Sequence, residues 1–128
     1  SRGQGATVIN AEECWYKSLV PTMEQIRETI GPDTPAYLTF DIDGFDSGIM
    51  QATGTPEPGG LQWDDAIDII RKASKICNIV GADVVELAPV KFLHSCDFLA
   101  SKLCYKILSY AFVKPKICNS VSFQMLEY

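Results

Sequence analysis

The sequence predicts an α/β domain built on a largely parallel sheet. Two short apolar runs have strand character, at residues 36–40 and 78–87, and a helical stretch lies between them at residues 63–72. A second helical stretch follows the later run. Strands that alternate with helices of about 10 to 15 residues are typical of parallel sheets. The length of 128 residues leaves room for one domain or for part of one.

The N-terminal segment predicts one helical turn and one helix. Residues 6–9 are a short β-prone run, and Asn10 then precedes Ala-Glu-Glu, a pattern typical of a capped helix start. Thr22, with Gln25 three residues later, resembles a capping box, and apolar residues recur at helical spacing until a Gly-Pro pair. We therefore expect a helix over residues 22–30.

The middle of the chain predicts a strand, a loop, a helix and a second strand. Residues 36–40 read Ala-Tyr-Leu-Thr-Phe, which is typical of a buried strand, and residues 44–60 are rich in turn formers. Over residues 63–72 apolar side chains recur at i, i+3, i+4 and i+7, the pattern of an amphipathic helix. The apolar run 78–87 predicts a second buried strand, which Pro89 ends.

The C-terminal part predicts one more helix. From Asp97 to Ala111 the apolar residues form a wide helical stripe, and Lys114 with Pro115 would stop that helix. The last dozen residues support no assignment.

Composition and charge exclude several classes of protein. Eleven Lys and Arg against sixteen Asp and Glu give a net charge of −5, without any basic run, so we expect no nucleic-acid partner. No stretch approaches the roughly 18 uncharged apolar residues of a membrane span, and the N-terminus lacks the apolar core of a signal peptide. We expect a cytoplasmic chain with no membrane partner. The five cysteines predict reduced thiols, and zinc ligation is disfavoured because His94 is the only histidine.

An acidic cluster follows the first predicted strand, at Asp41, Asp43 and Asp46. If the strand continues to Asp43, the side chains of Asp41 and Asp43 project from the same face. Two carboxylates at a buried strand end repel each other, and a divalent cation with oxygen ligands would neutralise them. Solvated loop acids or a helix cap remain an equal alternative. A calcium loop does not fit, because Ala52 stands where a bidentate Glu is needed.

Two further features belong with this cluster. Residues 52–60 combine small residues, hydroxyls and prolines, which suggests close approach of the backbone to a ligand or an ordinary long turn. Glu86 stands near the end of the second apolar strand, where a parallel neighbour would aim it toward the same crevice. A carboxylate there suits a guanidinium, and the alternative is a salt bridge to a Lys or Arg of the chain.

Taken together, these segments resemble the C-terminal half of a ureohydrolase, a member of the arginase/agmatinase family. The resemblance rests on three segments, residues 37–43, 52–60 and 83–89. Residues 97–103 resemble the last helix of the agmatinase-like members. The resemblance assigns residues 1–113 to the C-terminal part of a three-layer α/β/α domain with a mainly parallel sheet. Residues 114–128 form a tail of unassigned order.

The family resemblance also implies a site and a reaction. It implies a binuclear Mn²⁺ site with Asp41 and Asp43 among the metal ligands, and Glu86 at the guanidinium end of the substrate. Hydroxide made available by the cations would attack the guanidinium carbon of agmatine or an arginine-like compound, releasing urea and an amine. The chain is thus expected to be part of a metal-dependent hydrolase of C–N bonds, and a homo-oligomer.

Three more residues take their roles from the same resemblance. Thr55 and Gly54 would line the substrate pocket, with Gly54 also supporting the loop. Asp46, at the third acidic position, would support the loop and not bind metal.

Several departures from the family pattern qualify these expectations. Ser47 and Gln51 stand where the family usually has prolines, and both changes are expected to loosen the loop. The upstream motifs that carry the other metal ligands do not occur, and His94 is expected at the surface. Alone, the chain is therefore expected to be inactive, as a fragment, a truncated product or half of a shared site. The alternative function is a catalytically inactive remnant that acts as an interaction or oligomerisation module.

Overall fold

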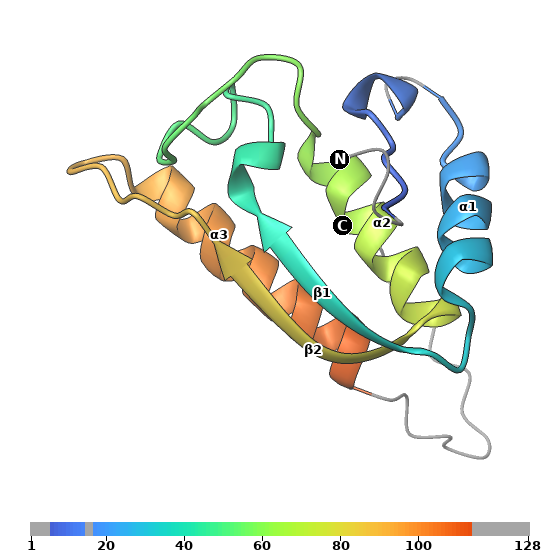
Figure 1. The fold of residues 1–128 in the computed structure, drawn as a ribbon. Helices are drawn as coiled ribbons and strands as arrows, with labels where there is room; N and C mark the ends of the chain where they lie inside the picture. The colour runs from blue at the N-terminus through green and yellow to red at the C-terminus, as the bar shows by residue number, and fades with distance from the viewer. Residues whose placement is uncertain (1–5, 15–16, 114–128) are drawn as a thin grey trace, which may run out of the picture.

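The computed structural model describes residues 6–14 and 17–113 as an α/β structure (Figure 1). The order of elements is a 3-10 turn η1 (Ala11–Glu13), α1 (Val20–Ile30), β1 (Pro35–Asp41), a 3-10 turn η2 (Ile42–Gly44), α2 (Trp63–Ile76), β2 (Asn78–Val85), α3 (His94–Ile107) and a π-helical turn η3 (Leu108–Phe112). The predicted helical turn, three helices and two strands are all present. The expectation that the strands are buried is wrong, because burial alternates along each of them and one face is open. β2 also ends at Val85, before the expected Leu87, because the backbone turns to a positive φ at Glu86. The β-prone run at residues 6–9 forms no strand.

The two strands pair in parallel, as the alternation of strands and helices predicts. The register runs from Pro35 opposite Asn78 to Asp41 opposite Val85, with one irregularity after Ala36. Because parallel strands end at the same edge of a sheet, the residues that follow Asp41 and Val85 emerge together. This edge carries the acidic cluster.

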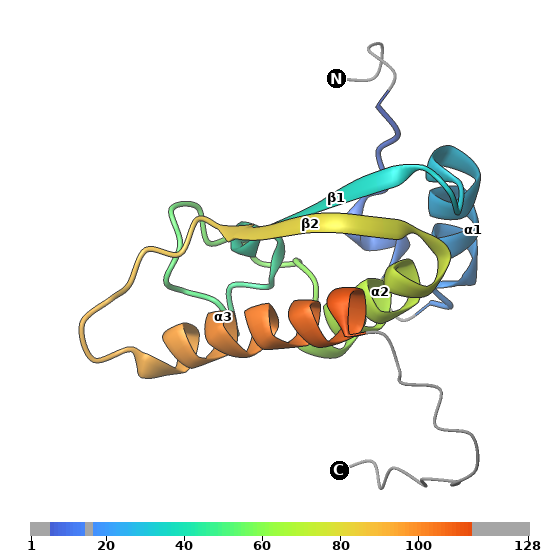
Figure 2. The same ribbon diagram turned by 90° about the horizontal axis from the view of Figure 1, so that it is seen from below.

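One face of the sheet packs against α2 and α3, which lie on the same side in Figure 2. The core lies between these layers and includes Ile42, Met50, Ile70, Leu103 and Ile107, all nearly inaccessible to solvent. The apolar stripes of the two helices supply most of it, which is why the periodicity of these helices was readable in the sequence.

The opposite face of the sheet is exposed in the described part of the chain. Tyr37 is 64% exposed and Val80 58% exposed. The Tyr37 ring lies over Gly81, where an added Cβ would stand 2.7 Å from it, and the Tyr37 hydroxyl donates to Asp83 Oδ2 at 3.3 Å. The contact between Tyr37 and Asp83 therefore covers part of this face, and apolar side chains such as Val80 are exposed on the rest.

The start of α1 differs from the prediction. The helix begins at Val20, so Pro21 lies inside its first turn and Thr22 is buried instead of capping the helix. The amide of Val20 donates to Ser18 Oγ at 3.3 Å. A proline lacks only a donor that the first turn leaves unpaired anyway, so Pro21 is tolerated there and does not interrupt the helix.

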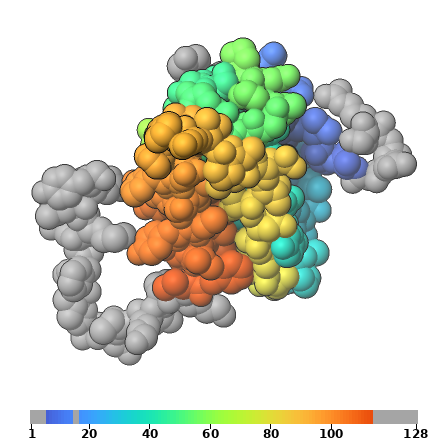
Figure 3. All heavy atoms as spheres, turned by 90° about the vertical axis from the view of Figure 1, so that its left-hand side faces the viewer, coloured from blue at the N-terminus to red at the C-terminus, as the bar shows by residue number. Residues whose placement is uncertain are grey.

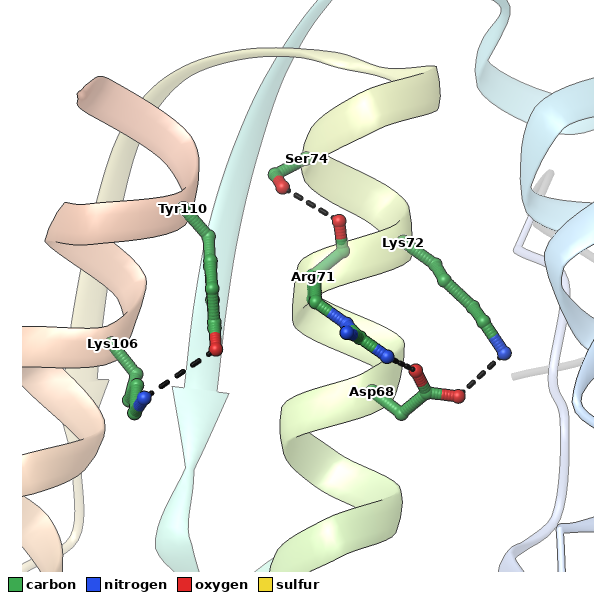
Figure 4. A network of polar contacts seen from close by, with 6 residues as sticks. All are labelled: Asp68, Arg71, Lys72, Ser74, Lys106 and Tyr110. Carbon is green, nitrogen blue, oxygen red and sulfur yellow. Dashed lines mark hydrogen bonds and ion pairs between the residues drawn. The ribbon is translucent and has the colours of Figure 1, made fainter. Parts of the chain in front are cut away.

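A local ion network lies along α2 (Figure 4). Asp68 accepts from Arg71 at 2.7 Å and from Lys72 at 2.5 Å. Partial burial acts to raise the pKa of Asp68, but the bonds from Arg71 and Lys72 outweigh it and lower that pKa. Such half-exposed pairs contribute about 1 kcal/mol or less, so the network adds little to the stability of the helix.

The cysteines of the described residues agree with the expectation of reduced thiols. Cys14, Cys77, Cys96 and Cys104 are free thiols, and Cys118 lies outside the described residues. Over residues 6–14 and 17–113, every helix is too short or too polar to cross a bilayer.

Candidate functional site

The acidic cluster begins where β1 ends. The strand stops at Asp41, and Asp43 lies in the turn η2, so the expectation of two acids on one face of a strand is wrong. The Asp41 carboxylate accepts from the amide of Asp43 at 2.9 Å and thereby caps the turn. This local bond competes with strand extension and bends the chain after Asp41. Ile42, fully buried between the two acids, anchors the turn in the core.

The Asp43 carboxylate has one satisfied oxygen and one unsatisfied oxygen. Its Oδ2 accepts from the Thr55 hydroxyl, whereas its Oδ1 is buried and has no hydrogen-bond partner in the described residues. A buried carboxylate oxygen without a donor is unfavourable unless a cation lies beside it. Asp43 therefore fits the role of an oxygen ligand to a hard metal ion.

Asp41 and Asp43 alone do not make a full metal shell. Within the part of the chain that the structure describes, no group of three or more His, Cys, Asp or Glu side chains gathers to hold an ion. The described residues thus offer a carboxylate pair, and a metal ion bound there would need further ligands.

Asp46 holds the base of the loop that follows. Its carboxylate accepts from the amide of Gly48 at 2.7 Å and from the amide of Gly59 at 2.7 Å. These bonds lower the pKa of Asp46, with Gly59 the largest cause. Phe45 pairs with Leu61 in an isolated parallel bridge, so the loop leaves and returns at one point.

Hydrogen bonds occur at both positions where the family usually has proline. The amide of Ser47, which a proline would lack, donates to the Glu57 carbonyl at 3.0 Å. The Gln51 side chain donates to the Gly48 carbonyl at 3.1 Å, and its Oε1 accepts from Cys96 Sγ at 3.5 Å. These bonds constrain the loop where the expected prolines are missing.

Glu86 follows β2 directly, with its backbone at a positive φ of 69°. The Thr53 hydroxyl donates to the Glu86 carbonyl at 3.1 Å, and the amide of Ala88 donates to the Ala52 carbonyl at 2.9 Å. A Cβ added to Gly54 would stand 3.9 Å from Glu86 Oε2. The two segments lie side by side in Figure 3, where green loop atoms touch the yellow segment after β2.

Four of the six predicted site residues thus lie next to one another: Glu86, Gly54, Thr55 and Asp43. Glu86 lies beside Gly54, and the next residue, Thr55, bonds Asp43. Asp41 caps the turn that carries Asp43, while Asp46 lies at the loop base. His94 is exposed at the start of α3.

Sequence reasoning missed Thr53. Its hydroxyl reaches a carbonyl 33 residues further along the chain. The only signal in the sequence was a second threonine beside Gly54.

Comparisons with known proteins extend this picture. The model of the arginase family matches residues 1–109. The guanidinobutyrase of Pseudomonas aeruginosa is 44% identical over 109 residues, which cover 84% of this chain and 34% of the relative. The mitochondrial agmatinase of Gallus gallus is 53% identical over 87 residues, covering 68% and 25% respectively. The chain spans roughly a quarter to a third of the length of these curated relatives.

Solved structures share the fold. The proclavaminate amidino hydrolase of Streptomyces clavuligerus superposes with a TM-score of 0.77 at 32% identity, covering 86% of this chain and 37% of that one. A hypothetical agmatinase of Burkholderia thailandensis gives a TM-score of 0.70 at 34% identity, covering 83% and 33%. The expected α/β fold class is thereby confirmed.

Proposed function

Because this chain belongs to the arginase family, we propose that it forms the C-terminal part of a manganese-dependent ureohydrolase that converts a linear guanidine to urea and an amine. Agmatine, which would yield putrescine, is the favoured substrate, since relatives from Gallus gallus and Photorhabdus laumondii are named agmatinases. Other guanidino compounds are alternatives, because a guanidinobutyrase is also among the relatives.

One observation carries this proposal: the path of contacts from Glu86 through Gly54 and Thr55 to Asp43. It places an anionic group suited to a guanidinium near a carboxylate whose buried oxygen is unsatisfied. Both groups lie at the carboxyl end of parallel strands, where α/β sheets bind ligands, and this supports the proposal of a guanidine hydrolase.

Each residue has a proposed role in the reaction. Asp41 and Asp43 would hold Mn²⁺, and Thr55 would fix the Asp43 carboxylate through its hydroxyl. Glu86 would accept hydrogen bonds from the substrate guanidinium and orient it. When bound, the cations supply the charge that lowers the pKa of a water molecule, so that hydroxide is available at neutral pH. Addition of water to the guanidinium carbon and cleavage of the bond between that carbon and the nitrogen that carries the alkyl chain would yield urea and the protonated amine.

The complete site would need donors beyond the described residues. We propose that they belong to other polypeptide, in the same protein or in an associated subunit, so urea release by this chain alone is not expected. Homo-oligomerisation and a cytoplasmic location are part of the proposal, although some relatives are named mitochondrial.

Calorimetric titration of Mn²⁺ into the purified chain tests the metal site. We expect binding that Asp43→Asn weakens at least about tenfold, because a carboxylate is replaced by a neutral amide. Asp33→Asn is the matched control, since Asp33 is exposed in the loop before β1. Equal affinity of the wild type and Asp43→Asn would contradict the assignment of Asp43.

The second candidate is the inactive interaction module, which the exposed apolar face of the sheet favours. Tyr37, Val80 and Val85 are exposed there, and apolar faces of this kind mark contact surfaces. This candidate predicts self-association of the chain without any metal. A monodisperse monomer in sedimentation velocity would contradict it.

A further inference from the structure

The backbone at Glu86 has an uncommon conformation. Its φ of 69° lies in the left-handed region, which residues other than glycine, asparagine and aspartate seldom adopt. Such conformations persist only where the surrounding structure enforces them, and they gather at ligand-binding positions. The contacts around Glu86 therefore determine whether it keeps this backbone.

Two hydrogen bonds connect this segment to the neighbouring loop. Thr53 Oγ1 donates to the Glu86 carbonyl at 3.1 Å, and the amide of Ala88 donates to the Ala52 carbonyl at 2.9 Å. The first bond acts on Glu86 itself and comes from a side chain, so substitution removes it without altering the backbone. The second bond attaches the following residues to the same loop.

The side chain of Glu86 leaves this backbone toward Gly54. Its Oε2 would lie 3.9 Å from a Cβ added at Gly54, which is an ordinary contact distance, so the carboxylate lies directly beside this residue. The next residue, Thr55, bonds the Asp43 carboxylate. Residues 53–55 thus contact both Glu86 and Asp43.

We infer that Thr53 is a positioning residue for substrate: its hydroxyl holds Glu86 in the left-handed conformation and so directs the Glu86 carboxylate toward the guanidinium of the ligand. The inference rests on the proposed substrate-binding role of Glu86. Thr53 itself touches no reacting atom in this scheme. It acts through the carbonyl of Glu86.

The test is an NMR titration of agmatine into the ¹⁵N-labelled chain and its variants. A residue at positive φ has a short distance between its own amide and α protons, so Glu86 should give a strong NOE between them. Agmatine should shift the amide signals of Glu86 and Gly54. Thr53→Val removes the hydroxyl at nearly constant shape, Thr53→Ser retains it, and Thr39→Val is the control on the exposed face of β1.

We expect Thr53→Val to weaken both the strong NOE and the agmatine-induced shifts, with affinity reduced roughly threefold to tenfold. Thr53→Ser and Thr39→Val should keep both signals. If Thr53→Val does not fold, Thr53→Ala replaces it in the same comparison. A role in stability alone would lower the melting temperature and leave the NOE and the shifts of the folded chain intact, which would overturn the inference.

A further variant separates this inference from the proposed function. Glu86→Gln should abolish the agmatine-induced shifts. If it does so while Thr53→Val changes nothing, the positioning role is wrong and the substrate role of Glu86 stands. If Glu86→Gln binds agmatine like the wild type, or if the wild type shows no shifts at Glu86, both the substrate role and the inference built on it are wrong.

Discussion

Gly60 shows how closely individual residues are constrained at the base of the site loop. A Cβ at Gly60 would stand 2.5 Å from the carbonyl carbon of Phe45 and 2.6 Å from the amide nitrogen of Asp46. Both neighbours are backbone atoms, which cannot rotate away. Any side chain at Gly60 therefore has to move the base of the loop.

Gly60→Ala should lower the free energy of unfolding by about 1 to 3 kcal/mol, because an added methyl group in a close-packed position forces the backbone to shift. Gly44→Ala is the control, since an added Cβ there meets no heavy atom within 4 Å. Urea unfolding followed by circular dichroism measures both variants. Equal loss of stability in the two variants would contradict this account.

At the scale of elements, the loop from Asp46 to Gly60 is held closed by bonds between its two ends. The Asp46 carboxylate binds amides near both of its ends, and the bridge between Phe45 and Leu61 closes it. Bonds from Ser47 and Gln51 add to this closure. An element held by one ionised carboxylate should depend on pH.

Asp46→Asn should destabilise the chain at neutral pH, and the difference from wild type should shrink in acid. The folded pKa of Asp46 lies below the unfolded value of about 3.9, so its stabilisation is complete above that pH and is lost as the pH falls through the folded pKa. Thermal melts between pH 7 and pH 2 measure the difference. The exposed Asp33→Asn should match wild type throughout. A difference for Asp46→Asn that does not change with pH would refute the role of its charge.

The whole molecule is a sheet with helices on one face and little cover on the other in the described residues. Large apolar side chains remain exposed on the open face, with Val80 at 58%. A parallel sheet is ordinarily buried on both faces, so this surface is expected to find a partner.

Val80→Lys should reduce self-association of the chain, because a charge in the middle of the open face opposes pairing with a second copy. Val20→Lys is the matched control, since Val20 is 54% exposed but stands at the start of α1. Sedimentation velocity over a range of concentrations measures both. If the two variants associate to the same extent, the open face is not the contact surface.

At this scale the sequence predicted the elements better than their ends. Helical periodicity located α2, and short apolar runs rich in β-branched and aromatic residues located β1 and β2. The end of β1 could not be predicted, since it depends on the bond from the amide of Asp43 to its neighbour Asp41. The start of α1 was missed because Thr22 and Gln25 resemble a capping box, whereas the helix begins at Val20 and accepts Pro21 in its first turn.

The sequence predicted which residues form the candidate site, but only part of how they contact one another. Two of the acids, Asp43 and Glu86, lie close to the ends of the two predicted parallel strands, and Thr55 lies in the loop between these strands. Their proximity could therefore be expected. The bond from Thr53 to Glu86 could not, because it joins a side chain to a distant backbone group and leaves no periodic pattern.

The parallel pairing of β1 with β2 has a consequence for how the chain is made. Asp43 leaves the ribosome well before Glu86, and β1 has no other partner strand in the described residues. While β2 is still inside the ribosome, β1 has nothing to pair with among the described residues. Asp43 and Glu86 therefore come together only after both strands have been released.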